Sequence, residues 1–381
     1  MKPQKVRFAV ALAVITFVVG DGLVGVFIRM RGLKGPGQSK FSAELVAYQP
    51  HPYRAYMDKP GRYFTNLGIT RVVDDNGHQV LPEDRDLPRR PKASSEKRLL
   101  FLGGSTTASG WCFPLVALLN REHGGTGTVY KAICAGTGAY TSQENLIDLV
   151  TSGFSYHPDM VIAYLPVNDM YRLPEYPDFR RDYSHFRIPM KDHNPPLILM
   201  RPWRYPFTAK LAQIYYQNKM RDLESHVRAP RLKQAMQLAR SREATLVPQV
   251  IDAVLENIWN MQILCAARGV PFVLITQKLF KANSEDQEHR TALTVRAIDA
   301  IKHDAQLASV PMLHLGDTFP DQIDASAQAR IRATFPDFQG DLNVAMAGDS
   351  MHLHDPGLLL FALFVHDYLR DSALLDKSGT P

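Results

Sequence analysis

Five short apolar runs, separated by segments with helical spacing, constrain the fold of this chain more than any other feature. The runs are too short for helices, and they span 98–102, 129–134, 160–165, 272–276 and 312–315. Between them, helical patterns occupy 113–121, 142–151, 248–268 and 288–308. Alternating strands and helices favour a parallel sheet that is wrapped on both faces. The sequence therefore predicts an α/β fold of three α/β/α layers with a parallel five-stranded sheet.

Three polar residues stand where such a sheet binds ligands. Ser105 follows the first apolar run through Gly103 and Gly104, which let the chain turn sharply before a helix. Asp349 and His352 lie three residues apart on one loop and can both face the crevice beyond the strand ends. Serine is a poor nucleophile alone and needs a histidine base, which a carboxylate holds in the correct tautomer. The sequence offers all three groups.

The order of these motifs resembles that of the SGNH, or GDSL-type, esterases and lipases over roughly 98–369. The matching motifs are Gly-Gly-Ser-Thr at 103–106, a glycine-rich turn at 134–142, Asn-Asp at 168–169 and Asp-x-x-His at 349–352. The resemblance implies a flavodoxin-like fold, with Ser105 as nucleophile, His352 as base and Asp349 as the group that orients it. It implies no cofactor.

The same resemblance implies an oxyanion hole, made by the N–H of Ser105, the Asn168 amide and the turn at Gly138 and Ala139. The family's glycine in that turn falls on Ala139 or, with a slip of one residue, on Gly138. Alanine supplies the N–H only if the turn does not demand a positive φ. Pro166 stands where the family has a second glycine, and proline fixes φ and removes a donor. These two departures keep a non-catalytic assembly or scaffold protein open as an alternative.

Other site chemistries have weaker support in the sequence. The Gly-x-Ser-x-Gly elbow of α/β-hydrolases does not occur. A metal site could use Asp349, His352 and His354, but no second histidine-rich cluster completes it. We interpret His314 as a structural histidine. The three cysteines are Cys112, Cys134 and Cys265, and all of them stand in apolar settings. We interpret them as core residues that form one disulfide at most.

The first 35 residues carry a targeting signal. Lysine and arginine precede an apolar run over 8–19, and apolar character resumes after Asp21 as far as Ile28. This pattern is either a signal peptide or a single membrane anchor. We expect an uncleaved anchor, because the apolar length can span a bilayer even though Asp21 would cost about 2.5–3.5 kcal/mol at its centre. The folded body is expected in the periplasm or at the cell exterior.

The remaining chain divides into an extension over 36–95, a catalytic domain over 96–372 and a tail over 373–381. Within the extension, 51–73 is interpreted as a strap that packs on the core, and 75–95 as a solvated loop. The catalytic domain carries an insertion at about 171–242. Aromatic residues and arginines alternate in this insertion, so it fits a sugar-binding surface or, equally, a lid whose aromatic residues are buried.

Charge and composition narrow the expected substrate. A net charge of +6 over 381 residues is modest and no nucleic-acid motif occurs, so nucleic acid is not an expected partner. A basic balance suits anionic lipid headgroups equally well. The family resemblance implies a serine esterase that cleaves O-acyl esters, acetyl above all. The extension also resembles that of membrane-anchored bacterial SGNH-like proteins associated with cell-envelope polysaccharides, which implies a small molecule or an envelope or exported polysaccharide as substrate. An O-acyltransferase, a lipase or a thioesterase remain alternatives, and protein partners are left open.

Overall fold

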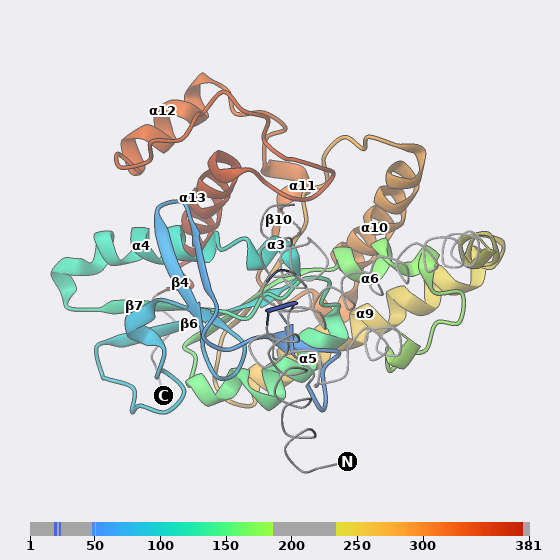
Figure 1. Cartoon of the computed structure of the whole chain (residues 1–381), viewed down its shortest axis with the longest axis horizontal. Helices are drawn as coiled ribbons and strands as arrows, with labels where there is room; N and C mark the ends of the chain where they lie inside the picture. The colour runs from blue at the N-terminus through green and yellow to red at the C-terminus, as the bar shows by residue number, and fades with distance from the viewer. Residues whose placement is uncertain (1–18, 21–22, 24–47, 50, 186–233, 376–381) are drawn as a thin grey trace, which may run out of the picture. The chain divides into compact units, whose positions relative to one another are not determined.

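The computed structural model describes residues 19–20, 23, 48–49, 51–185 and 234–375 (Figure 1). The chain divides into two compact units, and nearly all described residues belong to the unit formed by 50–187 and 235–381. The fold reported below is that of this unit. The predicted limits of the extension, the catalytic domain and the tail stay predictions.

The centre of the unit is a mixed sheet of eight strands in the order β10-β9-β8-β6-β7-β5-β4-β3. Its five parallel strands are β6 (Glu96–Gly103), β7 (Val129–Cys134), β8 (Met160–Leu165), β9 (Phe272–Thr276) and β10 (Met312–His314). These strands are the five apolar runs, so the predicted α/β fold with a parallel core is confirmed.

The extension continues the sheet, which corrects the predicted count of five strands. It supplies β3 (Tyr63–Asn66), β4 (Ile69–Val73) and β5 (Gln79–Val80), which pair antiparallel. Gln79 pairs with Cys134 and thereby covers the edge of β7, which would otherwise expose unpaired backbone groups. The expectation of a solvated loop over 75–95 is wrong, because His78 and Leu87 are fully buried. Two further short strands are β1 (Tyr48–Gln49) and β2 (Met57–Asp58).

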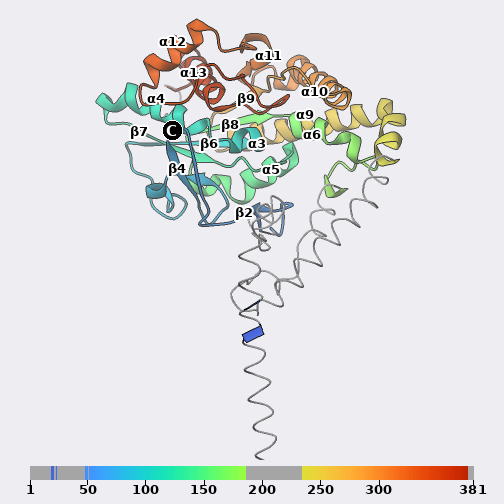
Figure 2. The same cartoon turned by 45° about the horizontal axis from the view of Figure 1, so that its top comes forward.

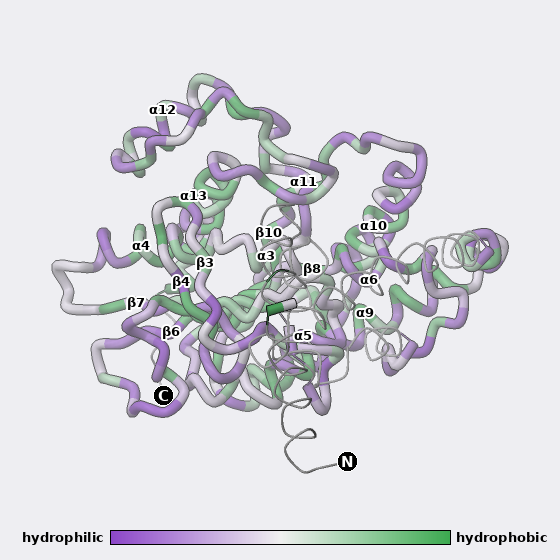
Figure 3. Tube along the Cα trace, viewed as in Figure 1, coloured by the Kyte–Doolittle hydropathy of each residue, from purple (hydrophilic) through white to green (hydrophobic). Residues whose placement is uncertain are grey.

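Two hydrophobic cores lie on opposite faces of the sheet. Alternate residues of β6 belong to different cores, with Leu99 and Phe101 in one and Leu100 and Leu102 in the other, as the period of a strand requires. The first core is closed by α4 (Cys112–His123) and α13 (Asp355–Asp371), and the second by α5 (Ser142–Thr151), α9 (Glu243–Ala266) and α10 (Glu285–His303). Figure 2 shows α4 and α13 on one side of the sheet and α5 on the other, and Figure 3 shows the apolar central strands.

Shorter helices complete the unit. Two of them, α3 (Ser105–Ala108) and α6 (Val167–Tyr171), begin just after β6 and β8 and so lie at the carboxyl ends of the parallel strands. The others are α11 (Leu315–Thr318) and α12 (Ala325–Thr334), with 3-10 turns at Pro82–Asp84, Gly124–Thr126, Gly153–Tyr156, Leu173–Glu175 and Ala305–Leu307. The predicted helices therefore exist, with ends displaced by a few residues.

No helix among the described residues is both long and apolar enough to cross a bilayer. The expected anchor lies outside the described residues except for Val19, Gly20 and Leu23. Most of the insertion, 186–233, also lies outside them. In its described part, the aromatic residues pack on one another: Phe179 lies edge-to-face with Tyr183, their centroids 5.5 Å apart, and Tyr183 is buried.

Candidate active site

The structure brings Ser105, His352 and Asp349 together in one hydrogen-bonded chain. Ser105 is the first residue of α3, at the end of β6, and its Oγ lies 2.7 Å from His352 Nε2. The other ring nitrogen, Nδ1, lies 2.7 Å from Asp349 Oδ2. The side chains of His352 and Asp349 are 39% and 40% exposed, so solvent and substrate can reach them.

A tight loop sets the spacing of Asp349 and His352. Asp349 Oδ1 accepts hydrogen bonds from the backbone N–H groups of Met351 and His352, at 2.8 and 2.7 Å. Aspartate side chains commonly accept hydrogen bonds from the backbone N–H groups that follow them in the chain, as in an Asx-turn. The N–H of Gly348 donates to the carbonyl of His352 at 2.8 Å, and α13 begins three residues later. The three-residue spacing therefore brings one carboxylate to both the backbone and the ring.

The hydrogen bonds at Asp349 keep its carboxylate ionised. Burial acts to raise the pKa of Asp349, but the N–H groups of Met351 and His352 and the His352 ring together lower that pKa below its usual value. An ionised carboxylate only accepts hydrogen bonds. It therefore favours the tautomer with a proton on Nδ1, which leaves Nε2 as the acceptor for the Ser105 hydroxyl.

Asn168 reaches the nucleophile because residue 104 has no side chain. A Cβ at Gly104 would lie 2.2 Å from Asn168 Nδ2, so any larger residue would displace the amide. The amide nitrogen also donates to the carbonyl of Tyr140 at 2.8 Å. Because an amide carries two N–H groups, one orients Asn168 on the turn and the second can meet a negative oxygen bound beside Ser105.

The turn that precedes α5 does adopt a positive φ. The N–H of Tyr140 donates to the carbonyl of Thr137 at 3.1 Å, and Ala139 has a φ of 62°. A left-handed conformation costs a residue with a Cβ roughly 1–2 kcal/mol. The condition for an unstrained alanine is therefore not met, and other contacts must hold the turn. The N–H of Thr137 reaches the carbonyl of Gly103 at 3.3 Å, which places the turn beside the nucleophile.

Asp169 ties the helix of Asn168 to α5. Its Oδ1 accepts hydrogen bonds from the hydroxyls of Ser142 and Tyr183, both at 2.6 Å, and the backbone N–H of Ser142 donates to both carboxylate oxygens. Asn257 on α9 donates to Ser142 Oγ at 2.9 Å. Burial raises the pKa of Asp169 to about 6 in spite of these donors. Two of the motifs contain Asp169 and Ser142, but Tyr183 and Asn257 come from segments that no motif marks.

Pro166 leaves a different neighbourhood from the one a glycine would give. It stands before α6, and the next backbone N–H, that of Val167, donates to Gln277 Oε1 at 2.8 Å. Gln277 also donates to the carbonyl of Tyr164 at 3.3 Å. A glutamine after β9 thus fixes the start of the helix that carries Asn168.

The extension contacts the turn at 137–140 directly, which sequence reasoning missed. Tyr56 donates its hydroxyl to the carbonyl of Gly138, and Thr137 Oγ1 donates to Asp58 Oδ2 at 3.3 Å. The N–H of Ala55 donates to Glu144 Oε2 at 3.1 Å. No signal in the sequence predicts these contacts, because they join segments about eighty residues apart. The extension is therefore part of the scaffold of the site.

The other residues considered from sequence stand apart from this chemistry. Among the residues that the structure describes, no cluster of three or more His, Cys, Asp or Glu could hold a metal ion. His314 Nδ1 lies 3.0 Å from Thr276 Oγ1, which fits a structural role. The three cysteines are buried and free.

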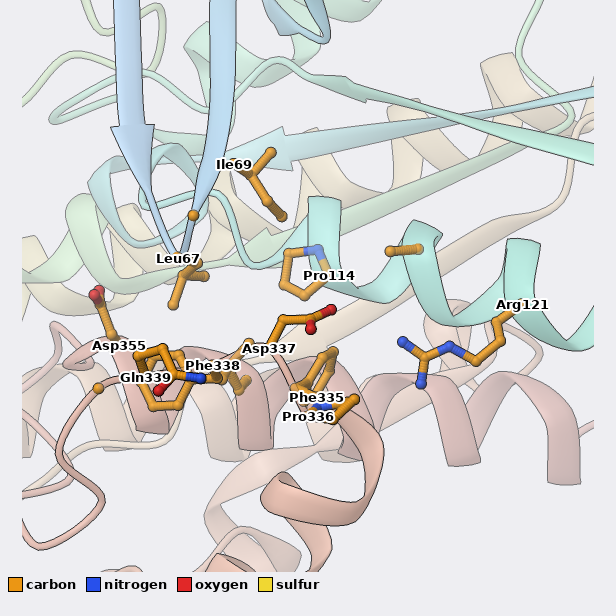
Figure 4. Close-up of a pocket in the computed structure, with 14 residues that line it drawn as sticks. Leu67, Ile69, Pro114, Arg121, Phe335, Pro336, Asp337, Phe338, Gln339 and Asp355 are labelled. Atoms are coloured by element: carbon orange, nitrogen blue, oxygen red, sulfur yellow. The ribbon is translucent and has the colours of Figure 1, made fainter.

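A groove of about 580 Å³ lies between the β3–β4 turn, α4 and the segment 335–340 (Figure 4), and Ser105, His352 and Asp349 are not among its lining residues.

No protein-family model matches this chain, and no curated protein matches it. Solved structures to which it is similar include the following three. A gut microbial diltiazem-metabolizing enzyme is 12% identical with a TM-score of 0.40, and the match covers 74% of this chain but only 48% of that one. A GDSL-like lipase from Bacteroides thetaiotaomicron is 12% identical (TM-score 0.35, 76% and 96% covered), and an acetylxylan esterase from Geobacillus stearothermophilus is 13% identical (TM-score 0.36, 75% and 95% covered).

Proposed function

We propose that this chain is a serine esterase that cleaves O-acyl esters. One observation carries the proposal: Asp349, His352 and Ser105 Oγ form one hydrogen-bonded chain, and the Asn168 amide lies against Gly104, the residue before Ser105. A nucleophile, a base, a group that orients the base and an oxyanion donor are the parts that acyl transfer requires.

The arrangement supports a two-step reaction. His352 Nε2 takes the hydroxyl proton while Ser105 Oγ forms a bond to the acyl carbon, and the carbonyl oxygen becomes an oxyanion. The N–H groups of Ser105 and of the Gly138–Ala139 turn, with the Asn168 amide, stabilise that charge. The intermediate collapses, the alcohol leaves with the proton from His352, and the acyl group stays on Ser105. Water, deprotonated by His352, then releases the carboxylic acid and free Ser105.

The substrate class and the location belong to the same proposal. An acetylated polysaccharide or a small acylated molecule suits the open triad, and aromatic and arginine side chains of the insertion can bind sugars and acidic groups. We propose that the first 35 residues attach the chain to a membrane and that the catalytic domain lies in the periplasm or cell exterior. An acyltransferase would use the same residues with a second alcohol in place of water.

Hydrolysis of aryl acetates, longer aryl esters and acetylated glycans tests the proposal. The wild type should turn over at least one class, and Ser105→Ala should lose that turnover. Ser109→Ala, four residues on, is the matched control and should keep it. Turnover that requires a glycan acceptor would make the chain a transferase. If the wild type hydrolyses none of them and Ser105→Ala fully complements a deletion strain, the chain is a scaffold and the proposal is wrong.

A further inference from the structure

Two hydrogen bonds, one from the hydroxyl of Tyr56 and one from the hydroxyl of Tyr140, link the extension to the turn at 137–140. The Tyr56 hydroxyl donates to the carbonyl of Gly138, and the Tyr140 hydroxyl donates to the carbonyl of Tyr56. The two rings meet edge-to-face with centroids 5.7 Å apart, and the residues are 6% and 1% exposed. This buried clasp joins segments that are far apart in the sequence.

The clasp acts on the peptide unit that carries the N–H of Ala139. The carbonyl of Gly138 and the N–H of Ala139 belong to one planar trans unit, so they point in opposite directions. A hydroxyl bound to Gly138 O therefore fixes the direction of the Ala139 N–H. The motif match assigns the family's oxyanion N–H to Ala139 or, with a slip of one residue, to Gly138, and the proposal takes the N–H of Ala139 as the donor.

The turn needs such a restraint because its third residue is alanine. In a type II turn the third residue has a positive φ, and in a type I turn it has a negative φ that alanine prefers. The two types differ by a flip of the central peptide unit, which here is the one between Gly138 and Ala139. A flip would reverse the Ala139 N–H and would break the hydrogen bond from Tyr56.

We propose that Tyr56 is a positioning residue of the oxyanion hole. Its hydroxyl holds the Gly138–Ala139 peptide in the orientation that a glycine would adopt freely. Tyr140 extends the effect, because its carbonyl accepts the Asn168 amide at 2.8 Å, so two oxyanion donors depend on the same turn. The inference rests on the proposed esterase function and adds the extension to the catalytic scaffold.

Tyr56→Phe, assayed with an aryl acetate, tests the role of the hydroxyl. We expect kcat to fall by about 10- to 100-fold, at or below the cost of removing one oxyanion donor, while KM changes less than about 2-fold. Tyr63→Phe is the matched control, because Tyr63 is 62% exposed on β3, and its kinetics should equal those of the wild type. Circular dichroism and thermal unfolding of each variant check that it is folded.

The Ala139→Gly background separates positioning from general stability. Glycine adopts the left-handed conformation without the restraint, so Tyr56→Phe should lower kcat by less than about 3-fold in that background. The double variant also provides the test if Tyr56→Phe alone does not fold. An equal loss of kcat in both backgrounds, or a Tyr56→Phe enzyme as active as the wild type, overturns the inference. An inactive wild type that a serine-directed probe does not label overturns the proposed function, and the inference with it.

Discussion

At the oxyanion turn, Ala139 holds a backbone conformation that glycine adopts without strain. Replacing it with glycine removes the contact between Cβ and the backbone that disfavours a positive φ. We expect Ala139→Gly to raise the free energy of unfolding by about 0.5–1 kcal/mol, measured by urea denaturation. The control is Ala117→Gly, at an exposed position inside α4, which should lower it by about 1 kcal/mol. A destabilised Ala139→Gly variant would contradict this account of the turn.

In the proposed mechanism Asn168 is the side-chain donor of the oxyanion hole, so its loss should act on the transition state. Asn168→Ala should keep the fold and lower kcat by roughly 10²–10³, because it removes a donor aimed at the developing charge. Steady-state kinetics with an aryl acetate measure the effect, and the exposed Asn343→Ala is the control. A change below about 3-fold in kcat would show that Asn168 does not face the oxyanion.

At the scale of single residues, the sequence predicts the site residues that lie within short local motifs. Ser105 follows a glycine pair after a strand, and Asp349 and His352 share one loop, so each motif is short enough to read directly. Tyr56 could not be found in this way, because its role depends on a contact with Gly138, eighty-two residues away. The left-handed φ of Ala139 was identified as a condition, but only the structure shows that it occurs.

Among the elements, the strands of the extension differ most from the sequence prediction, because they add three antiparallel strands to the sheet. Each of the five parallel strands contains a short apolar run, as buried parallel strands do, and this makes them predictable. β5 is two residues long and carries no usable periodicity, so its pairing with β7 could not be predicted. Its neighbour His78 is buried against Asp148 of α5, with 2.9 Å between Nε2 and Oδ2, which fixes the extension on the sheet.

Asp58 of β2 gives the extension a pH dependence. Burial raises the pKa of Asp58 from its ordinary value to about 6, although Arg62 and Thr137 act in the opposite direction. The folded chain thus binds this proton more tightly than the unfolded chain, and the stability that Asp58 contributes falls as pH rises from about 4 to 6.

Asp58→Asn removes this titration. Relative to the wild type, the variant should gain about 2 kcal/mol of unfolding free energy between pH 4 and pH 7, whatever its absolute stability. Urea denaturation at the two pH values measures the difference. The exposed Asp86→Asn is the control and should show no such gain. A difference between Asp58→Asn and wild type that does not change with pH would contradict the raised pKa.

For the whole molecule, the proposal assigns membrane attachment and export to the first 35 residues. If they form an exported anchor, a reporter fused after residue 381 should be active outside the cytoplasm and stay with membranes after a high-salt wash. A soluble, shortened product would instead indicate cleavage near Gly20. A reporter active only in the cytoplasm would contradict export.

We propose that Ser105 is a nucleophile activated by His352, and covalent labelling can identify such a serine. A fluorophosphonate transfers its phosphonyl group to an activated serine oxygen with loss of fluoride, so the label marks the nucleophile itself. Peptide mass spectrometry of the labelled wild type should find the group on Ser105 and not on Ser109 or Ser142, and Ser105→Ala should remain unlabelled. A wild type that is not labelled, or a label that persists in Ser105→Ala, would contradict the claim.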